Sequence, residues 1–213
     1  MTALTVPAGD VRLAGDLVEV PAERAVVVFA HGSGSGRHSP RNRRVAEHLN
    51  EQGFGTLLFD LLTPEEEEAD ARTARLRFDI GLLAGRLEEA IRWLRSTADA
   101  PAVGVFGAST GAAAALVAAA RLPGDVAAVV SRGGRPDLAG PALAEVRAPT
   151  LLIVGGRDVP VIGLNGRALA AMRDTDRHRL VVVPGAGHLF EEPGALDEVG
   201  RLSAAWFAEH VQR

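Results

Sequence analysis

The pentapeptide Gly107-Ala108-Ser109-Thr110-Gly111 contains a candidate nucleophile. It fits the pattern G-x-S-x-G and lies between an apolar run, Val103 to Phe106, and an alanine-rich stretch that is typical of a helix. A nucleophile on so sharp a strand-to-helix turn has strained backbone geometry, which requires small residues two positions away on either side. The pattern predicts that Ser109 is a nucleophile. The alternative is a glycine turn in which the Ser109 side chain only caps a helix.

A serine hydroxyl is a poor nucleophile at neutral pH, so Ser109 needs a histidine base and a carboxylate that orients the base. Asp158 follows the apolar run Leu151 to Val154, and His188 follows the run Val181 to Val183. Residues that come directly after neighbouring parallel strands meet at one edge of a sheet. We therefore predict a catalytic triad of Ser109, Asp158 and His188.

Each partner of the serine has an alternative interpretation. Asp158 could be a turn or helix-capping aspartate, and Asp137, which follows the preceding predicted strand, is a rival for the triad acid. His188 could be an ordinary loop histidine. His31 precedes the nucleophile in the chain, so we expect it to brace the loop that it begins rather than to act as the base.

The segment His31-Gly32-Ser33-Gly34-Ser35-Gly36 forms a glycine-rich loop after the apolar run Ala25 to Ala30. The dinucleotide pattern G-x-G-x-x-G fails here because Arg37 stands where its last glycine is required, and the phosphate-loop pattern fails at the same residue. We expect the loop to form part of an oxyanion hole instead. The donors would be the backbone N–H groups of Ser33 and of Thr110, which begins the following helix.

Substrate binding is predicted for Gly32, Gly34 and Arg37. The small residues leave backbone N–H groups accessible, and the arginine begins a basic cluster that would favour a substrate with a carboxylate or phosphate group. The alternative for the cluster is a solvated helix start. Its members are Arg37, His38, Arg41, Arg43 and Arg44.

The elements that position these residues follow from the hydrophobic pattern. Short apolar runs, typical of strands buried on both faces, alternate with helical stretches that have apolar residues at three- and four-residue spacing. This predicts an α/β fold with a mostly parallel sheet and helices on both faces. The segment Leu4 to Val20, with alternating runs around Gly9-Asp10 and Gly15-Asp16, predicts an antiparallel hairpin at the sheet edge. The other predicted strands are Ala25 to Ala30, Thr56 to Phe59, Val103 to Phe106, Val126 to Val130, Thr150 to Val154 and Leu180 to Val183, and the helices are Asn42 to Gln52, Ala71 to Arg95, Thr110 to Arg121, Asn165 to Arg173 and Ala195 to His210.

Residues 1–213 are predicted to form a single domain without a large cap domain. No internal repeat, low-complexity linker or change in charge marks a domain boundary. One acidic run, Pro64-Glu65-Glu66-Glu67-Glu68, interrupts the pattern. It is interpreted as a helix start that aids solubility, with a small lid as the alternative.

Composition excludes several classes of function. A formal net charge of −4 without a long basic tract makes nucleic acid an unexpected partner. The absence of cysteine excludes disulfides, thiolate metal sites and a cysteine nucleophile. The sequence contains no H-E-x-x-H motif, so we predict no metal site and no cofactor.

The first residues lack the features of a signal peptide, and no apolar run approaches the ~18 residues that span a bilayer, so we expect a cytoplasmic enzyme with no membrane partner. The oligomeric state stays open.

Together, the motifs resemble those of the α/β-hydrolase superfamily and, more narrowly, those of dienelactone-hydrolase-like proteins. The resemblance covers nearly the whole chain and is carried by His31-Gly32-Ser33, the Gly107 to Gly111 turn, Gly155-Gly156-Arg157-Asp158 and Gly187-His188. It implies an α/β-hydrolase fold with the chain order Ser, Asp, His.

Dienelactone hydrolases have a cysteine nucleophile where this chain has Ser109, so the resemblance does not imply their own reaction. Similar domains also occur fused to phosphoribosyltransferases, but this chain has no paired acidic residues leading into a Thr-rich phosphate loop, so transferase activity is not implied.

The expected activity is hydrolysis of small esters, lactones or thioesters through an acyl-enzyme, with a small-molecule acyl compound as substrate. Two alternatives use the same fold: a non-catalytic ligand-binding or regulatory domain, and an acyltransferase with the same triad. Activity should rise between about pH 6 and pH 7.5, because the base must be neutral to accept a proton.

Overall fold

The computed structural model describes residues 1–20, 25–96 and 102–211, which contain an eight-stranded sheet. The strands are β1 (Thr2–Ala8), β2 (Val11–Val18), β3 (Ala25–Ala30), β4 (Gly55–Phe59), β5 (Ala102–Ala108), β6 (Val126–Arg132), β7 (Thr150–Gly155) and β8 (His178–Val183). Their order across the sheet is β1-β2-β4-β3-β5-β6-β7-β8. From β4 to β8 all pairs are parallel, whereas β2 pairs antiparallel with both β1 and β4. The predicted fold class, a mostly parallel sheet with an antiparallel N-terminal edge, is confirmed.

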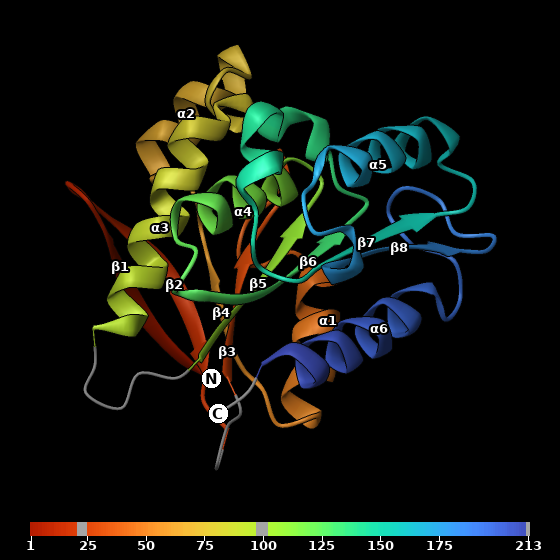
Figure 1. Ribbon diagram of the computed structural model, residues 1–213. Helices are drawn as coiled ribbons and strands as arrows, with labels where there is room; N and C mark the ends of the chain where they lie inside the picture. The colour runs from red at the N-terminus through yellow and green to blue at the C-terminus, as the bar shows by residue number, and fades with distance from the viewer. Residues whose placement is uncertain (21–24, 97–101, 212–213) are drawn as a thin grey trace.

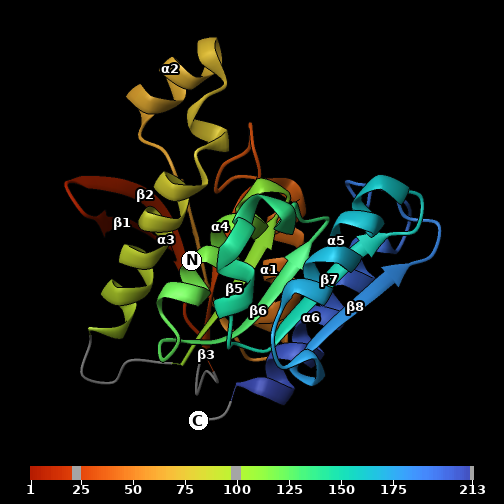
Figure 2. The ribbon, with the colours of Figure 1, turned by 45° about the horizontal axis from the view of Figure 1, so that its top comes forward.

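Helices cover both faces of the sheet (Figures 1 and 2). They are α1 (Pro40–Glu51), α2 (Pro64–Thr73), α3 (Ile80–Arg95), α4 (Thr110–Arg121), α5 (Val159–Ala171) and α6 (Ala195–His210), with the 3-10 segments η1 (Leu76–Phe78), η2 (Pro136–Glu145) and η3 (Thr175–Arg177). Helices α1 and α6 pack on one face, and α3, α4 and α5 lie on the other. Within the described ranges, no helix is long and apolar enough to cross a membrane.

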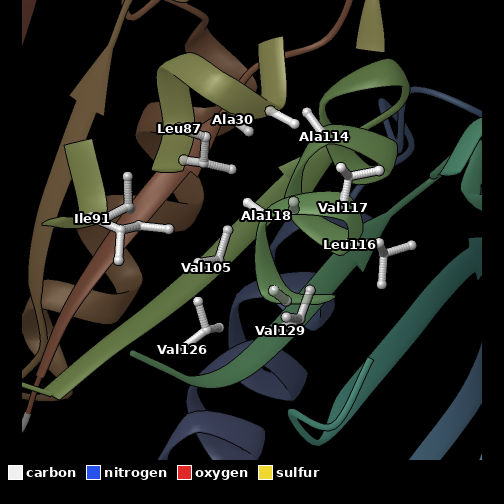
Figure 3. Packing of buried hydrophobic residues seen from close by; sticks show 14 of the residues in the cluster. Ala30, Leu87, Ile91, Val105, Ala114, Leu116, Val117, Ala118, Val126 and Val129 are labelled. Carbon is white, nitrogen blue, oxygen red and sulfur yellow. The ribbon is translucent and has the colours of Figure 1, made fainter. Parts of the chain in front are cut away.

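Helix α4 is buried along almost its whole length, which fixes the turn that precedes it. Its small alanine side chains let it lie close to the sheet, where Ala118 packs near Val105 of β5 and Val129 of β6 (Figure 3). Leu87 and Ile91 of α3 extend the same apolar cluster. Burying a side chain such as Leu87 or Ile91 contributes about 1.5–3 kcal/mol to stability. The cluster that includes these residues therefore holds the N-terminus of α4 firmly at the edge of the sheet.

The N-terminal hairpin is confirmed at the edge of the sheet. Its turn is at Gly9-Asp10, since Ala8 pairs with Val11. Gly15 and Asp16 lie within β2, where they pair with β4. The Cα of Gly15 lies close to the side chains of Val6 and Phe59, because a Cβ at this position would lie 3.0 Å and 3.3 Å from their atoms. This glycine therefore marks close packing rather than a second turn.

The predicted single helix from Ala71 to Arg95 is wrong, because the chain forms α2, η1 and α3 there. Helix α2 ends at Thr73, and the residue that caps it, Ala74, has left-handed backbone geometry with φ 52°. The Asp70 carboxylate then accepts hydrogen bonds from the backbone N–H groups of Leu76 and Arg77, at 2.7 and 3.1 Å. Asp79 caps α3 through the N–H of Leu82. Side chains of aspartate thus compete with the helical backbone at both ends of the interruption.

The predicted helix from Asn165 to Arg173 begins too late. Helix α5 already begins at Val159, directly after Asp158, and has a proline in its first turn, where the missing N–H costs nothing. Its first residue, Val159, is 69% exposed, and the buried positions of the helix include the polar Asn165, which weakens the apolar pattern at its start. The start of α5 matters for function because it places Asp158 at the junction between a strand and a helix.

Candidate active site

Ser109 has the strained backbone that the G-x-S-x-G pattern predicts. Its φ of 52° and ψ of −119° are rarely adopted by a non-glycine residue and cost about 1–3 kcal/mol. Hydrogen bonds hold this geometry: the Ser109 N–H donates to the carbonyl of Arg132 at 3.2 Å, and the Ser109 carbonyl accepts from the N–H groups of Ala112 and Arg135, both at 3.1 Å. The turn is therefore fixed between β5 and the end of β6.

The two glycines of the motif are required by close backbone contacts. A Cβ on Gly107 would lie 2.4 Å from Cα of Ala112, and a Cβ on Gly111 would lie 2.2 Å from the carbonyl oxygen of Ala30. Both distances are far below a normal van der Waals contact, and both involve backbone atoms that cannot move aside. The glycines let strand, turn and helix approach one another at Ser109.

The alternative interpretation of Ser109 as a helix cap is wrong. Within the described residues, its side chain makes no capping hydrogen bond to α4, although the residue occupies the N-cap position. Ser109 is partly exposed, whereas the next residue, Thr110, is buried. The serine hydroxyl is thus accessible at the C-terminal edge of the central strands, beside the unpaired first N–H groups of α4.

Asp158 and His188 meet at the same edge of the sheet. Asp158 follows β7, His188 follows β8, and 2.6 Å separates the Asp158 Oδ2 from the His188 Nδ1. The Asp158 side chain is 13% exposed and the His188 side chain 39% exposed. A carboxylate at this distance keeps the proton on Nδ1, which leaves Nε2 free to accept a proton.

The rival acid, Asp137, is bound elsewhere. Its two carboxylate oxygens accept hydrogen bonds from Nε and Nη2 of Arg135, at 2.9 and 2.8 Å. These bonds from Arg135 hold the pKa of Asp137 below its usual value. Asp137 forms a local pair with its neighbour, so the geometry favours Asp158 as the partner of His188.

His188 and Ser109 both adjoin the segment at the end of β6. The N–H of Ser109 donates to the carbonyl of Arg132, and a Cβ on the next residue, Gly133, would lie 3.6 Å from Cε1 of His188. Among the described residues, no hydrogen bond joins the Ser109 hydroxyl to His188. Catalytic hydrogen bonds of this kind are commonly long without substrate and shorten in the complex.

His31 braces the glycine-rich loop, as predicted. The backbone N–H of Leu61 donates to the His31 Nε2 at 3.0 Å, and the His31 Nδ1 lies 3.0 Å from the carbonyl oxygen of Gly32, to which it donates. Burial lowers the pKa of His31, so the ring stays neutral and can accept on one nitrogen while donating from the other. The ring joins the ends of β3 and β4.

The loop after β3 lies against the turn that holds the nucleophile. A Cβ on Gly32 would lie 3.1 Å from Cβ of Ser109, so this glycine allows close approach. The N–H of Ser35 donates to the carbonyl of Gly32 at 3.2 Å, and Gly34 has φ 66°, which closes a tight turn. Ser33 is exposed at the start of this turn. Ser33 and Thr110, the two expected oxyanion donors, therefore adjoin Ser109 from different segments.

A cavity of about 450 Å³ opens beside these two residues. Helix α2 contributes to its wall, which gives the acidic run a place near the site in addition to its role as a helix start. Burial and the nearby Asp60 carboxylate raise the pKa of Glu67. The cavity is lined by His31, Gly32, Ser33, Gly34, Ser35, Gly36, Arg37, His38, Asp60, Leu61, Leu62, Glu67, Asp70, Arg77, Leu83 and Thr110.

Arg37, the predicted substrate-binding cation, lines this cavity but already has acidic partners. Its guanidinium forms an ion pair with Asp60, its N–H donates to the same carboxylate at 2.7 Å, and its Nε lies 3.7 Å from Asp16. Arg43 also pairs with Asp16, at 3.2 Å, and Arg44 pairs with an aspartate of α6. Much of the basic cluster is thus neutralised by acidic residues nearby.

Sequence reasoning missed two residues that connect the acid and the base. The N–H of Gly187 donates a bifurcated hydrogen bond to both carboxylate oxygens of Glu192, each at 3.0 Å, and Nη2 of Arg157 donates to the same carboxylate at 2.7 Å. Arg157 also donates through Nε to the carbonyl of Gly185, at 2.6 Å. Arg157 directly precedes Asp158, so the pair joins the turn of the acid to the loop of the base. The only signal in the sequence was an opposite charge beside each of the two motifs.

Known proteins resemble this chain over nearly its full length. The model of the dienelactone hydrolase family matches residues 13–207. The crystal structure of a dienelactone hydrolase from Anabaena variabilis ATCC 29413 is 57% identical, with a TM-score of 0.96, and the match covers 99% of this chain and 98% of that one. Est1E from Butyrivibrio proteoclasticus is 14% identical, with a TM-score of 0.81 and 98% of each chain covered, which bears on the fold alone.

A curated relative from Mycobacterium tuberculosis H37Rv is 58% identical over 208 residues and is named "Putative phosphoribosyl transferase". A protein of the same name from strain CDC 1551 matches equally well. The match covers 97% of this chain but 46% of each relative. This chain therefore spans about half the length of the curated relatives that it matches.

Proposed function

This chain belongs to the dienelactone hydrolase family and has the α/β-hydrolase fold, and on that basis we propose that it is a serine hydrolase. Its substrates in this proposal are small esters, lactones or thioesters, cleaved through an acyl-enzyme. Ser109 attacks the carbonyl carbon, and His188 accepts the hydroxyl proton and then returns it to the leaving group. Asp158 keeps the imidazole oriented and stabilises its cationic form. Water then attacks the acyl-enzyme, with His188 as the base again.

The oxyanion in this mechanism lies between two backbone donors. The N–H of Thr110 is at the positive end of α4, and the N–H of Ser33 is on the loop that touches Ser109 through Gly32. Preorganised donors of this kind typically contribute about 2.7–4 kcal/mol each to stabilisation of the transition state. The cavity beside both residues offers room for the acyl or leaving group.

The observation that carries the proposal is the strained backbone of Ser109, with φ 52° and ψ −119°. A non-glycine residue with φ 52° at the end of a buried strand costs free energy that the fold must offset, and its hydroxyl makes no structural hydrogen bond in return within the described residues. Strain of this kind persists where it serves function. The 2.6 Å contact between Asp158 and His188 adds the remaining components of the proposed triad.

A fluorophosphonate probe tests the proposal directly. We expect the folded protein to be labelled at Ser109, as located by mass spectrometry, and the heat-unfolded protein to remain unlabelled. Ser109→Ala should abolish the labelling and lower turnover by roughly 10⁴-fold or more. The matched control is Ser96→Ala, which removes an exposed serine at the end of α3 and should change neither result. Full activity in Ser109→Ala would exclude the proposed nucleophile.

Two other activities would use the same fold. Acyl transfer to an acceptor other than water needs the same residues, and product analysis with added alcohol or amine separates it from hydrolysis. If an accessible fluorophosphonate gave no labelling, a ligand-binding or regulatory domain would become the better interpretation. Phosphoribosyl transfer is named only for relatives about twice as long, and we do not propose it for this chain.

A further inference from the structure

Arg132, the last residue of β6, is a buried cation with no acidic partner among the described residues. The residue is 6% exposed, and its Nε and Nη1 make no hydrogen bond to any described residue. Burial lowers the pKa of Arg132 to about 10, and the nearby Arg41 contributes to the shift. Buried charges in proteins are ordinarily paired, because an unpaired charge loses its hydration without compensation. A buried cation of this kind needs a hydrogen-bond acceptor, which a water molecule or an anion can supply.

The Arg132 side chain lies on the face of the sheet that α1 and α6 cover. Side chains alternate along a strand, and Ala128 and Val130 of β6 belong to the cluster beneath α1 and α6, whereas Val129 belongs to the opposite cluster. Arg132 shares the parity of Ala128 and Val130. Its electrostatic interaction with Arg41, in the first turn of α1, agrees with this placement.

Arg41 has one further buried donor without a partner among the described residues. Its Nε is buried without a hydrogen-bond partner among the described residues, and its Nη1 lies 3.3 Å from Oε1 of Glu191, a carboxylate that is 66% exposed. The positive charges of Arg132 and Arg41 thus repel each other, and Glu191 is a solvated carboxylate near Arg41. The other arginines of this turn differ: Arg43 pairs with Asp16, and Arg44 pairs with Asp197.

The N-terminus of α1 makes this place more positive. Helix α1 has no acidic residue in its first turn, where an anion would be stabilised by the helix dipole. Instead, the turn has arginines, which the dipole disfavours. The buried Arg132, whose charge interacts with that of Arg41, and the buried Nε of Arg41 both favour an anion near the start of α1, as does the helix dipole.

We propose that Arg132 and Arg41 form a binding site for a small oxyanion, a phosphate or carboxylate group held by guanidinium hydrogen bonds. Neither arginine is among the residues that line the cavity beside Ser33 and Thr110. It adjoins the nucleophile through the backbone, because the carbonyl of Arg132 accepts the N–H of Ser109. The inference goes beyond the proposed function and does not depend on it.

Inorganic phosphate and acetate serve as the probes, each at constant ionic strength with chloride as the balancing anion. In isothermal titration calorimetry and thermal unfolding, at least one probe should bind the wild-type protein saturably and raise its Tm. Arg132→Met keeps an apolar stem and removes the charge, and it should weaken binding at least about tenfold. Arg41→Gln is the second variant, for the case in which Arg132→Met does not fold. Arg44→Gln, which removes an exposed arginine of the same helix, should bind like wild type.

The outcomes separate the proposal from its alternatives. Binding of phosphate alone assigns the site to a phosphate group, and binding of acetate assigns it to carboxylates as well. Equal responses in wild type, Arg132→Met and Arg41→Gln, or no response to either probe, would overturn the site and leave water or chloride as the partner of Arg132. Ser109→Ala should keep the anion response, so failure of the proposed hydrolase function and failure of the anion site can be told apart.

Discussion

The two halves of the candidate site are fixed in different ways. The nucleophile side consists of the loop 31–36 and the turn 107–111, which follow the neighbouring central strands β3 and β5. The acid-base side consists of the turn 155–158 and the loop 184–192, which follow β7 and β8 at the end of the sheet. Both sides lie at the C-terminal edge of the parallel strands, but one is in the core and the other is near the surface.

Backbone contacts hold the nucleophile side. Gly107 and Gly111 allow main-chain atoms to approach within distances that no other residue tolerates, and the buried His31 joins two strands through main-chain hydrogen bonds. The acid-base side also has a close backbone contact, since a Cβ on Gly155 would lie 2.4 Å from the carbonyl oxygen of Gly187, but here the polar side chains of Glu192 and Arg157 add partly solvated hydrogen bonds. We therefore expect damage to the backbone contacts of the nucleophile side to impair folding, whereas loss of the polar side chains on the acid-base side should lower the rate.

Among variants of the acid-base side, Asp158→Asn should give the largest effect, and on activity alone. An amide cannot stabilise the imidazolium and favours the wrong tautomer of His188, so we expect kcat to fall by about 10³- to 10⁴-fold, with an unchanged circular dichroism spectrum and Tm within a few degrees. Steady-state kinetics on an activated ester measures the loss. Asp137→Asn is the matched control, because that carboxylate pairs with Arg135 instead. A larger loss in Asp137→Asn than in Asp158→Asn would reverse the assignment of the acid.

Gly111→Ala should act mainly on folding. Its Cβ would meet the carbonyl oxygen of Ala30 at 2.2 Å and that of His31 at 2.4 Å, so the backbone must shift. We expect a loss of about 4 kcal/mol or more in the free energy of unfolding, measured by urea denaturation. Gly85→Ala in α3 is the control, because nothing lies within 4 Å of its added Cβ, and it should stabilise the helix by up to about 1 kcal/mol. A stable Gly111→Ala protein would contradict the rigid view of the nucleophile side.

His31→Gln should remove part of the pH dependence of stability. Burial lowers the pKa of His31 in the folded state, so the unfolded state binds the proton first as the pH falls. The stabilisation is complete above the unfolded value of about 6.5 and is lost as the pH falls from there toward the folded value. We expect wild type to lose stability between about pH 7 and pH 5, and His31→Gln to lose less over that range.

The matched control for His31 is His178→Gln, on β8. Burial also lowers the pKa of His178, but its Nε2 bonds to the carbonyl of Arg173, far along the chain from the nucleophile. Thermal unfolding as a function of pH compares the two variants. Both should flatten the profile, whereas only His31→Gln should reduce activity at neutral pH. Equal activity in the two variants would mean that the brace does not position the oxyanion loop.

The sequence predicted the nucleophile side more completely than the rest of the molecule. Glycine at close contacts and a histidine beside a strand are local signals, and the parallel strands that carry them read as continuous apolar runs. The break between α2 and α3 was missed because it depends on Asp70 and Asp79 side chains that bind backbone N–H groups. The Glu192 bridge was missed for a similar reason, since it joins residues whose contact only the folded chain creates.

The unpaired Arg132 could not have been predicted at all. An arginine at the end of an apolar strand reads as a surface residue, and only the fold places it beneath α1 near Arg41. Periodicity predicted the strand but stopped short of its last residues. Burial of a long polar side chain depends on packing between elements that are distant in sequence, which a single sequence does not report.

Glu192→Gln should have the smallest effect. It tests whether a polar side chain of the acid-base side affects the catalytic rate or the stability of the fold. Hydrogen bonds from the N–H of Gly187 hold the pKa of Glu192 below its usual value, so its contribution is present above about pH 4.5 and is lost as the pH falls through the folded value. A neutral amide keeps one acceptor but weakens the bond to Arg157. We expect a loss of about two- to fivefold in kcat at neutral pH, with little change in KM or Tm, because the loop that carries His188 becomes less well positioned.

Glu191→Gln, beside it in the chain and exposed, is the control and should leave kcat unchanged. If Glu192→Gln instead lowered Tm as strongly as a variant of His31, the acid-base side would be part of the rigid framework, and the contrast between the two sides would fail.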